Sequence, residues 1–111
     1  MKKININLSK KESNHLGSVN LIRLIEPDQI EGRVATMNYA WLEKYKTLEL
    51  HKHIDGNEYY LFLKGNGEIL IVKEWTEIIP GDFVTISKGL THSLKNTNND
   101  SLEFVTLRTI E

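Results

Sequence analysis

The sequence contains no cysteine, only two prolines and no long uninterrupted apolar run. The absence of cysteine excludes disulfides, thiolate metal ligands and a cysteine nucleophile. The start of the chain, MKKININLSKKES, is basic, but its apolar residues alternate with asparagine and never form the continuous apolar stretch of a signal peptide or a membrane-spanning helix. We therefore expect a cytoplasmic protein with no membrane partner.

Neither sign of charge is in excess, because 14 lysine and arginine residues stand against 15 aspartate and glutamate residues. This balance gives no indication of a nucleic-acid partner. The motifs of a serine nucleophile elbow, a phosphate-binding loop and a dinucleotide-binding loop are also missing, which removes those enzyme classes. A hydrophobic fraction of 40% over 111 residues instead fits one globular domain, expected to span residues 1–111 with an N-terminal arm at 1–18.

What the sequence does contain is a series of short segments in which apolar and polar residues alternate with a period of two. These segments are rich in β-branched and aromatic residues, and turn formers separate them. Together with one hint of a short helix or arm around residues 9–16, they predict an antiparallel sandwich or barrel. The expected strands are 4–8, 19–25, 33–41, 47–53, 58–64, 67–75, 82–87 and 102–108.

The segment HKHIDGNEYYLFLKG, residues 51–65, places two histidines two residues apart on an expected strand. His51 and His53 then project from the same face, with Cα atoms about 6.6 Å apart. The turn at 55–57 reverses the chain and brings Glu58 back at the start of the next strand, on the same inner face. A carboxylate is thus expected beside two imidazoles.

A second segment, GDFVTISKGLTHSLKN at residues 81–96, adds a lone histidine, His92. A single strand histidine is usually structural, and an HxH pair alone is a weak motif. Taken together, however, three imidazoles and one carboxylate form a mixed nitrogen and oxygen set that suits iron, manganese, nickel, zinc or copper. The sequence therefore indicates a site for one divalent transition metal.

The first segment resembles the first signature motif of the cupin superfamily, G(X)5HXH(X)4E(X)6G. His51, His53, Glu58 and Gly65 stand at the intervals of that motif, and Tyr45 stands where its leading glycine belongs. The departure falls on a turn position and leaves the ligand set intact.

The second segment is similar to the second cupin motif, G(X)5PXG(X)2H(X)3N. Gly81, Gly89, His92 and Asn96 fall in register with it, while Ser87 replaces the proline. Proline would fix φ before the turn, so serine is expected to leave that corner looser without moving His92.

The resemblance covers about residues 40–108 and is typical of small single-domain cupins. It implies an all-β fold, an antiparallel double-stranded β-helix that forms a conical, jelly-roll-like β-barrel. It also implies one divalent metal (Fe, Mn, Ni, Zn or Cu) in the lumen, bound by His51, His53, Glu58 and His92.

The fold does not imply one reaction, so function has to be argued from the site. Three neutral imidazoles and one carboxylate leave an octahedral ion with two open positions, which is typical of catalytic rather than structural sites. The preferred hypothesis is a metalloenzyme of dioxygenase or isomerase/lyase type that acts on a small oxygen-rich molecule. The alternative is a cupin that binds or senses a small ligand without turnover.

Strand parity supplies candidates for further polar groups in the lumen. Glu49 shares the parity of His51 and is a candidate general base, with a position at the rim as the alternative. Tyr60 is a candidate donor to a bound oxygen species, or a wall of the pocket. Arg23 and Arg33 could clamp a carboxylate or phosphate, although arginines on a half-exposed sheet are more often solvated.

A short chain that closes a small barrel leaves strand edges and outward apolar residues to be covered. Small cupins resemble one another in pairing through N-terminal strands. We therefore expect a homodimer with residues 4–8 or 19–25 at its interface.

Overall fold

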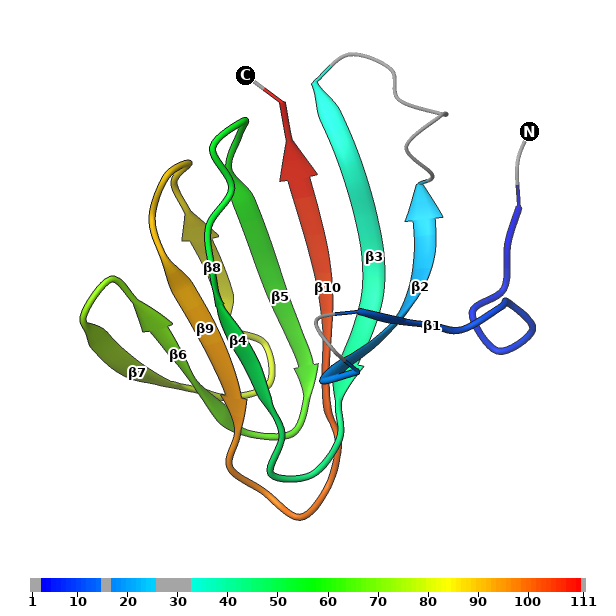
Figure 1. Ribbon diagram of the computed structural model, residues 1–111. Coiled ribbons are helices and arrows are strands. Elements are labelled where there is room, and N and C mark those ends of the chain that lie inside the picture. The colour runs from blue at the N-terminus through cyan, green and yellow to red at the C-terminus, as the bar shows by residue number, and fades with distance from the viewer. Residues whose placement is uncertain (1–2, 15–16, 26–32, 111) are drawn as a thin grey trace.

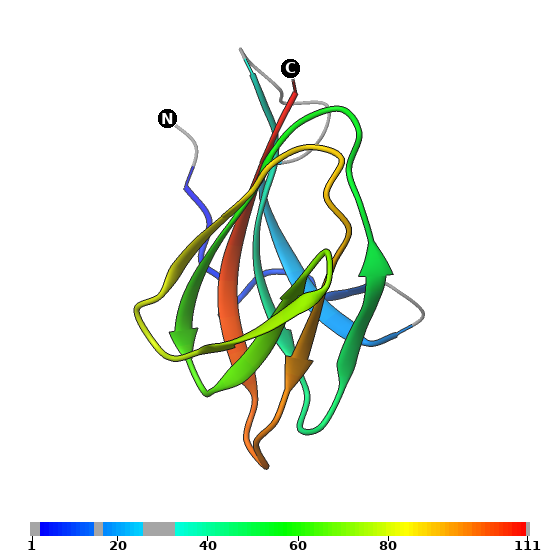
Figure 2. The ribbon, with the colours of Figure 1, turned by 90° about the vertical axis from the view of Figure 1, so that its left-hand side faces the viewer.

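The computed structural model describes residues 3–14, 17–25 and 33–110. These residues form ten strands and no helix, arranged as two antiparallel sheets that face one another (Figures 1 and 2). The all-β fold expected from the sequence is thereby confirmed. The strands are β1 (Glu12–Asn14), β2 (Val19–Ile25), β3 (Val34–Leu42), β4 (Thr47–His51), β5 (Glu58–Lys64), β6 (Gly67–Ile71), β7 (Glu74–Ile78), β8 (Phe83–Ile86), β9 (His92–Asn96) and β10 (Leu102–Thr109).

The chain passes back and forth between the two sheets after β3. The larger sheet has the order β1-β2-β3-β10-β5-β8 and the smaller sheet the order β4-β9-β6-β7. Figure 1 shows β1 and β2 at one side of the molecule and β6 and β7 at the other. Because β4 and β5 belong to different sheets, the turn between them carries the residues of the first motif from one wall of the barrel to the other.

The core fills the space between the sheets with side chains of one parity. Tyr60, Phe62 and Phe104 are at most 2% exposed, and the rings of Phe62 and Phe104 lie 5.8 Å apart between centroids. On the other face of β5, Leu61 and Leu63 are 39% and 46% exposed. The alternation expected along this strand is therefore observed, and each buried aromatic side chain contributes roughly 2–3 kcal/mol of hydrophobic stabilisation.

Four of the expected elements differ from the structure. The strand expected at 47–53 ends at His51, so His53 lies beyond it. The strand expected at 67–75 is a hairpin, because Val72 adopts a φ of 58° between β6 and β7 although it is not a residue that signals a turn. Residues 6–8 form a turn rather than part of a strand at 4–8. Residues 12–14 form β1 where the sequence hinted at a short helix or arm, and 15–16 of that segment lie outside the described residues.

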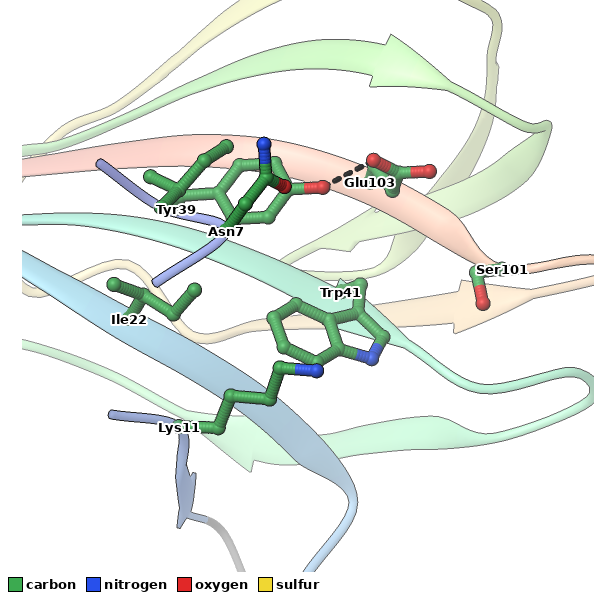
Figure 3. A pocket seen from close by; sticks show the side chains of 8 residues that line it. Asn7, Lys11, Ile22, Tyr39, Trp41, Ser101 and Glu103 are labelled. Atoms are coloured by element: carbon green, nitrogen blue, oxygen red, sulfur yellow. Dashed lines mark hydrogen bonds between the residues drawn. The ribbon is translucent and has the colours of Figure 1, made fainter. Parts of the chain in front are cut away.

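The N-terminal segment lies against the outer face of the larger sheet. It covers Ile22, which is 2% exposed, and Lys11 places its Nζ 5.6 Å from the centroid of the Trp41 ring. Between this segment and the sheet is a cavity of about 300 Å³, and on its wall Tyr39 donates a hydrogen bond to Glu103 (Figure 3). This part of the chain therefore covers outward apolar surface of its own sheet.

The contact between Tyr39 and Glu103 predicts an unusual titration. Burial raises the pKa of Tyr39 from 10.0 to about 12, and the hydrogen bond and charge of Glu103 add to the effect. Replacing Glu103 with glutamine should lower the pKa of Tyr39 toward 10.0, measured by ultraviolet absorbance of the phenolate. Glu43→Gln is the control, because Glu43 contacts Asn20 and Trp41. Equal titration curves for the two variants would contradict the assignment.

Tyr45 occupies the turn position at which the first motif has glycine. Its φ is 58°, in the left-handed region, and its side chain is 67% exposed. A residue with a Cβ atom in this region costs about 1–2 kcal/mol. Glycine removes that cost, but it loses more backbone entropy on folding, which cancels about half of the gain in stability. Tyr45→Gly should therefore raise the free energy of unfolding by about 0.5–1 kcal/mol in denaturant titration. Tyr45→Ala retains the Cβ and should give no gain; equal effects of the two would contradict the strain argument.

Candidate metal centre

Four side chains from different parts of the chain converge at one end of the barrel. His51 is the last residue of β4, and His53 lies two residues beyond it. Glu58 is the first residue of β5, and His92 is the first residue of β9. One possible ligand atom from each of them lies within 4.8 Å of all the others. The structure thus brings together all four residues that the sequence pattern indicated, and they could hold a metal ion.

Glu58 lies at the centre of this group. Its Oε1 is 3.0 Å from Nε2 of His92 and 3.9 Å from Nε2 of His51. Its Oε2 is 3.4 Å from Nε2 of His53. Ligand atoms about 2.0–2.3 Å from a common ion lie about 3–4.5 Å from one another, so the group fits a transition metal with small adjustments.

Backbone carbonyls orient two of the imidazoles. Nδ1 of His51 lies 2.8 Å from the carbonyl oxygen of Glu49, and Nδ1 of His92 lies 3.0 Å from that of Leu90. Since a carbonyl only accepts, both Nδ1 atoms carry a proton, and each neutral ring turns the lone pair of Nε2 toward Glu58. Two acceptors facing each other require a cation between them, either a proton or a metal ion.

The carboxyl of Glu58 is held in its charged form. Burial alone would raise its pKa, but hydrogen bonds with His51, His53 and His92 outweigh burial and hold the pKa well below its ordinary value. Burial likewise acts to lower the pKa of His51, yet its bonds to Glu58 and to the backbone of Glu49 give a net increase. Glu58 is therefore a carboxylate at neutral pH, the form that binds a metal.

The group opens into a cavity of about 290 Å³ inside the barrel. Strand register places its polar walls in two rows across the larger sheet. One row runs from β2 to β5 and the other from β3 to β5. The first row is Arg23, Asn38, Thr106 and Tyr60, and the second is Thr36, Arg108 and Glu58.

Tyr60, the candidate donor, lines this cavity and is 2% exposed. Burial raises the pKa of Tyr60 well above its ordinary value, and the charge of Glu58 and a hydrogen bond to Glu58 add to the increase. The phenol is therefore neutral at physiological pH and carries a proton next to the candidate metal ligands.

Glu49, the candidate general base, is exposed and does not line the cavity, so its expected inward orientation is wrong. The register between β4 and β9 shifts between Leu48 and His51, so that the buried Leu48 and the partly buried His51 both face inward. This irregularity breaks the period of two on which the expectation depended. The charge of Glu49 still contributes to the raised pKa of His51, and its catalytic role stays a prediction.

The two arginines considered from the sequence are placed differently. Arg23 lines the cavity, with its Nε 3.0 Å from Oε2 of Glu12, whereas Arg33 is exposed and outside the lining. The sequence interpretation missed Arg108 altogether. Counting in steps of two from the buried Phe104 would have placed Arg108 on the inner face beside Glu58.

The second motif supports the site through its backbone. Gly89, with a φ of 85°, donates from its backbone nitrogen to the carbonyl of His53 at 2.7 Å. The backbone nitrogen of the neighbouring Lys88 donates to Oδ1 of Asn57 at 2.9 Å. The turn before His92 is thus bonded to the turn that follows His53, and the change from proline to Ser87 leaves both bonds in place.

Asn96, the last residue of the second motif, holds the opposite end of the barrel. It is 1% exposed, and its Nδ2 lies 3.1 Å from the carbonyl oxygens of Leu42 and Glu43 and 2.7 Å from that of Asp100. Its Oδ1 accepts from the backbone of Asn98 at 3.0 Å. One side chain therefore joins the end of β3 to the loop between β9 and β10.

Known proteins are similar to this chain in sequence and in fold. The cupin domain family matches residues 42–108. The chain belongs to the cupin family. An oxalate-binding protein from Thermotoga maritima is 28% identical to this chain over 89 residues, which cover 80% of this chain and 74% of that protein.

Several solved structures superpose on nearly the whole chain. A predicted oxalate decarboxylase from Thermotoga maritima has a TM-score of 0.88 at 24% identity and covers 100% of both chains. The polyketide cyclase RemF from Streptomyces resistomycificus has a TM-score of 0.83 at 16% identity, with 100% of this chain and 80% of that chain covered. A sugar phosphate isomerase from Silicibacter pomeroyi has a TM-score of 0.80 at 15% identity, with coverages of 99% and 76%. At identities below 25%, these similarities show that the fold of this cupin is shared, and they do not extend to its function.

Within the part of the chain that the structure describes, no helix has the length and apolar character needed to cross a membrane.

Proposed function

We propose that this cupin binds one divalent metal ion and, at that ion, a small oxygen-rich anion of the dicarboxylate type. The observation that carries the proposal is the presence of two arginines, Arg23 and Arg108, in the cavity that is lined by three of the four candidate metal ligands, His51, His53 and Glu58. A cavity of about 290 Å³ suits a small metabolite. The name of the oxalate-binding relative supports the same class of ligand.

The charge of the site favours an anion. A divalent ion with three neutral imidazoles and the carboxylate of Glu58 retains one positive charge. The guanidinium group of Arg108 adds to it, whereas the charge of Arg23 is partly offset by its ion pair with Glu12. Among the described lining residues Glu58 is the only carboxylate. A carboxylate ligand would therefore meet a positive cavity in which N–H donors match its oxygen atoms.

Binding can be measured directly by titration calorimetry with protein loaded with Mn²⁺ or Zn²⁺. Oxalate and malonate should release heat with loaded protein and none after chelation, and a neutral diol of similar size should give no heat in either case. Equal binding of oxalate to loaded and chelated protein would overturn the role of the metal. Elemental analysis of protein purified without chelators would identify the ion among Fe, Mn, Ni, Zn and Cu.

A metal-dependent enzyme of dioxygenase or isomerase/lyase type is the second candidate, and Tyr60 is the observation that favours it. Its neutral phenol lies beside Glu58 and lines the cavity, where it could deliver a proton to a bound ligand. The bound ion would supply polarisation of ligand oxygens. Product analysis with and without oxygen, comparing the parent protein with Tyr60→Phe, tests this candidate. If carboxylates bind but none is converted to a product, the enzyme candidate is contradicted and only the binding function remains.

We also propose a homodimer, with its interface on the outer face of β5, β8 and β10 in place of residues 4–8 or 19–25, where the sequence led us to expect it. A groove of about 380 Å³ on the outer face of the larger sheet is lined by apolar side chains. There, Phe83 stacks on Tyr59 at 6.1 Å between ring centroids and is itself 63% exposed. Sedimentation at micromolar concentration should show a dimer that Phe83→Glu converts to a monomer. A monomeric parent protein would contradict the proposal, as would a dimer that survives this substitution.

A further inference from the structure

Arg108 makes a hydrogen bond that distinguishes His53 from the other two histidines of the site. Nη1 of Arg108 lies 3.0 Å from Nδ1 of His53. A guanidinium group has N–H donors and no acceptor, so Nδ1 of His53 must accept. His51 and His92, in contrast, donate from Nδ1 to backbone carbonyls.

The acceptor role of Nδ1 determines where the ring proton of a neutral His53 lies. The proton is on Nε2, the nitrogen that faces Oε2 of Glu58 at 3.4 Å. With its proton in place, this nitrogen has no lone pair to offer to a metal. For His53 to bind a metal through Nε2, the proton has to be on Nδ1 instead, where it would point at the N–H group of Arg108.

Two donors cannot share that contact, and the positive charge of an ion would further repel the guanidinium group. Arg108 therefore has to leave His53 when His53 becomes a ligand. Its position on β10, directly across from Glu58 on β5, keeps the released guanidinium beside the site.

Arg108 has N–H donors that are not used in hydrogen bonds. Its Nε is buried without a hydrogen-bond partner among the described residues. Its Nη2 is 3.9 Å from Oδ2 of the half-exposed Asp55, which is too long for a hydrogen bond. A buried donor without a partner costs about 1–3 kcal/mol, so a carboxylate in the cavity would relieve an existing deficit.

We propose that Arg108 alternates between two partners: it blocks His53 when no metal is bound, and it is released to bind the carboxylate ligand once His53 coordinates the ion. The second half of this proposal rests on the proposed function. Because coupling between two ligands is reciprocal, the anion should also tighten the binding of the metal.

The first test observes the ring proton of His53 directly. Long-range proton–nitrogen correlation spectra of nitrogen-15-labelled protein report which ring nitrogen carries a proton. In chelated protein Nδ1 of His53 should be unprotonated, whereas Nδ1 of His51 and of His92 should be protonated. Addition of Zn²⁺ should move the proton of His53 to Nδ1. A His53 already protonated on Nδ1 in chelated protein would overturn the proposal.

The second test measures the affinity for Zn²⁺ without any anion, by competition with a chromophoric chelator. Arg108→Gln removes the blocking donor, since the glutamine carbonyl can accept from Nδ1–H, and affinity should rise by at least about fivefold. Arg23→Gln is the matched control, because Arg23 lines the same cavity and bonds to Glu12. Equal gains in the two variants would show only the loss of a positive charge and would overturn the blocking role.

Anion binding separates this proposal from the proposed function. Oxalate should bind Zn²⁺-loaded parent protein, and Arg108→Gln should weaken that binding even though it tightens the binding of Zn²⁺. If loaded parent protein binds no carboxylate, the proposed function and the second partner of Arg108 fail, while the spectra and the Zn²⁺ affinities still decide the blocking of His53. Should Arg108→Gln fail to fold, the spectra of the parent protein decide it alone.

Discussion

Replacement of Glu58 by glutamine should lower the affinity for Zn²⁺ by at least about 100-fold, because outer-shell changes alone cost 10–100-fold and Glu58 is a candidate ligand itself. The substitution keeps the shape of the side chain but removes the charge around which the three histidines gather, with the nearest contact 3.0 Å long to His92. Chelator competition at neutral pH measures the loss.

Glu49→Gln is the matched control for this experiment. Glu49 lies next to the site in sequence, but its side chain is exposed and outside the cavity, so this variant should keep the affinity of the parent protein. Equal losses in both variants would indicate a general effect of negative charge and would contradict the assignment of Glu58 as a ligand. Activity of Glu49→Gln, if turnover is found, would also decide the catalytic role that the sequence suggested.

The same carboxylate should make stability depend on acid pH. The pKa of Glu58 is lower in the folded protein than its ordinary value of 4.5, so its contribution to stability is present above that value and is lost as the pH falls below it. Denaturant titrations of chelated protein should therefore show parent and Glu58→Gln converging in stability below about pH 4.5. A constant difference down to pH 3 would contradict the lowered pKa.

Replacement of Asn96 by alanine should cost about 3 kcal/mol of unfolding free energy, which corresponds to a midpoint about 10 °C or more lower in a thermal melt. The alanine variant leaves a small void and deprives three buried or partly buried carbonyls of their donor. Such a loss is among the largest that a single polar substitution produces.

Asn98→Ala serves as the reference for this prediction. The side chain of Asn98 donates to the carbonyl oxygen of Asn66 at 2.9 Å at an exposed position, so its removal should cost less than about 1 kcal/mol. A similar destabilisation in both variants would mean that the buried network of Asn96 has no special weight.

The sequence predicted the strands well where alternation was strict and the turn residues were conventional. β2 and β5 have the bounds expected for them, Val19–Ile25 and Glu58–Lys64. The hairpin at Val72 was missed because a valine with positive φ gives no local signal and is tolerated only through the pairing of β6 with β7. Tertiary contacts, rather than propensity, determine such a turn.

The candidate ligands were predictable because His51, Glu58 and His92 lie at the start or end of a strand and His53 lies two residues beyond β4, so that their spacing and the turn residues between them determine their positions. The walls of the cavity were not, since they depend on which strands become neighbours. Thr36 and Arg108 face each other only because β3 pairs with β10, far away along the chain. Glu49 shows the other limit, in that one irregular step near the end of β4 reverses the side on which a residue lies.

The division of the candidate ligands between the two sheets has a mechanical consequence. Glu58 belongs to the larger sheet, whereas His51 and His92 belong to the smaller one. An ion bound by all three would be a further cross-link between layers that side-chain packing, connecting turns and hydrogen bonds such as that of Asn96 to Leu42 also hold together. Opening of the barrel would then require release of the ion, so amide hydrogen exchange in β5 and β9 should slow together, and by a similar factor, as the metal concentration rises.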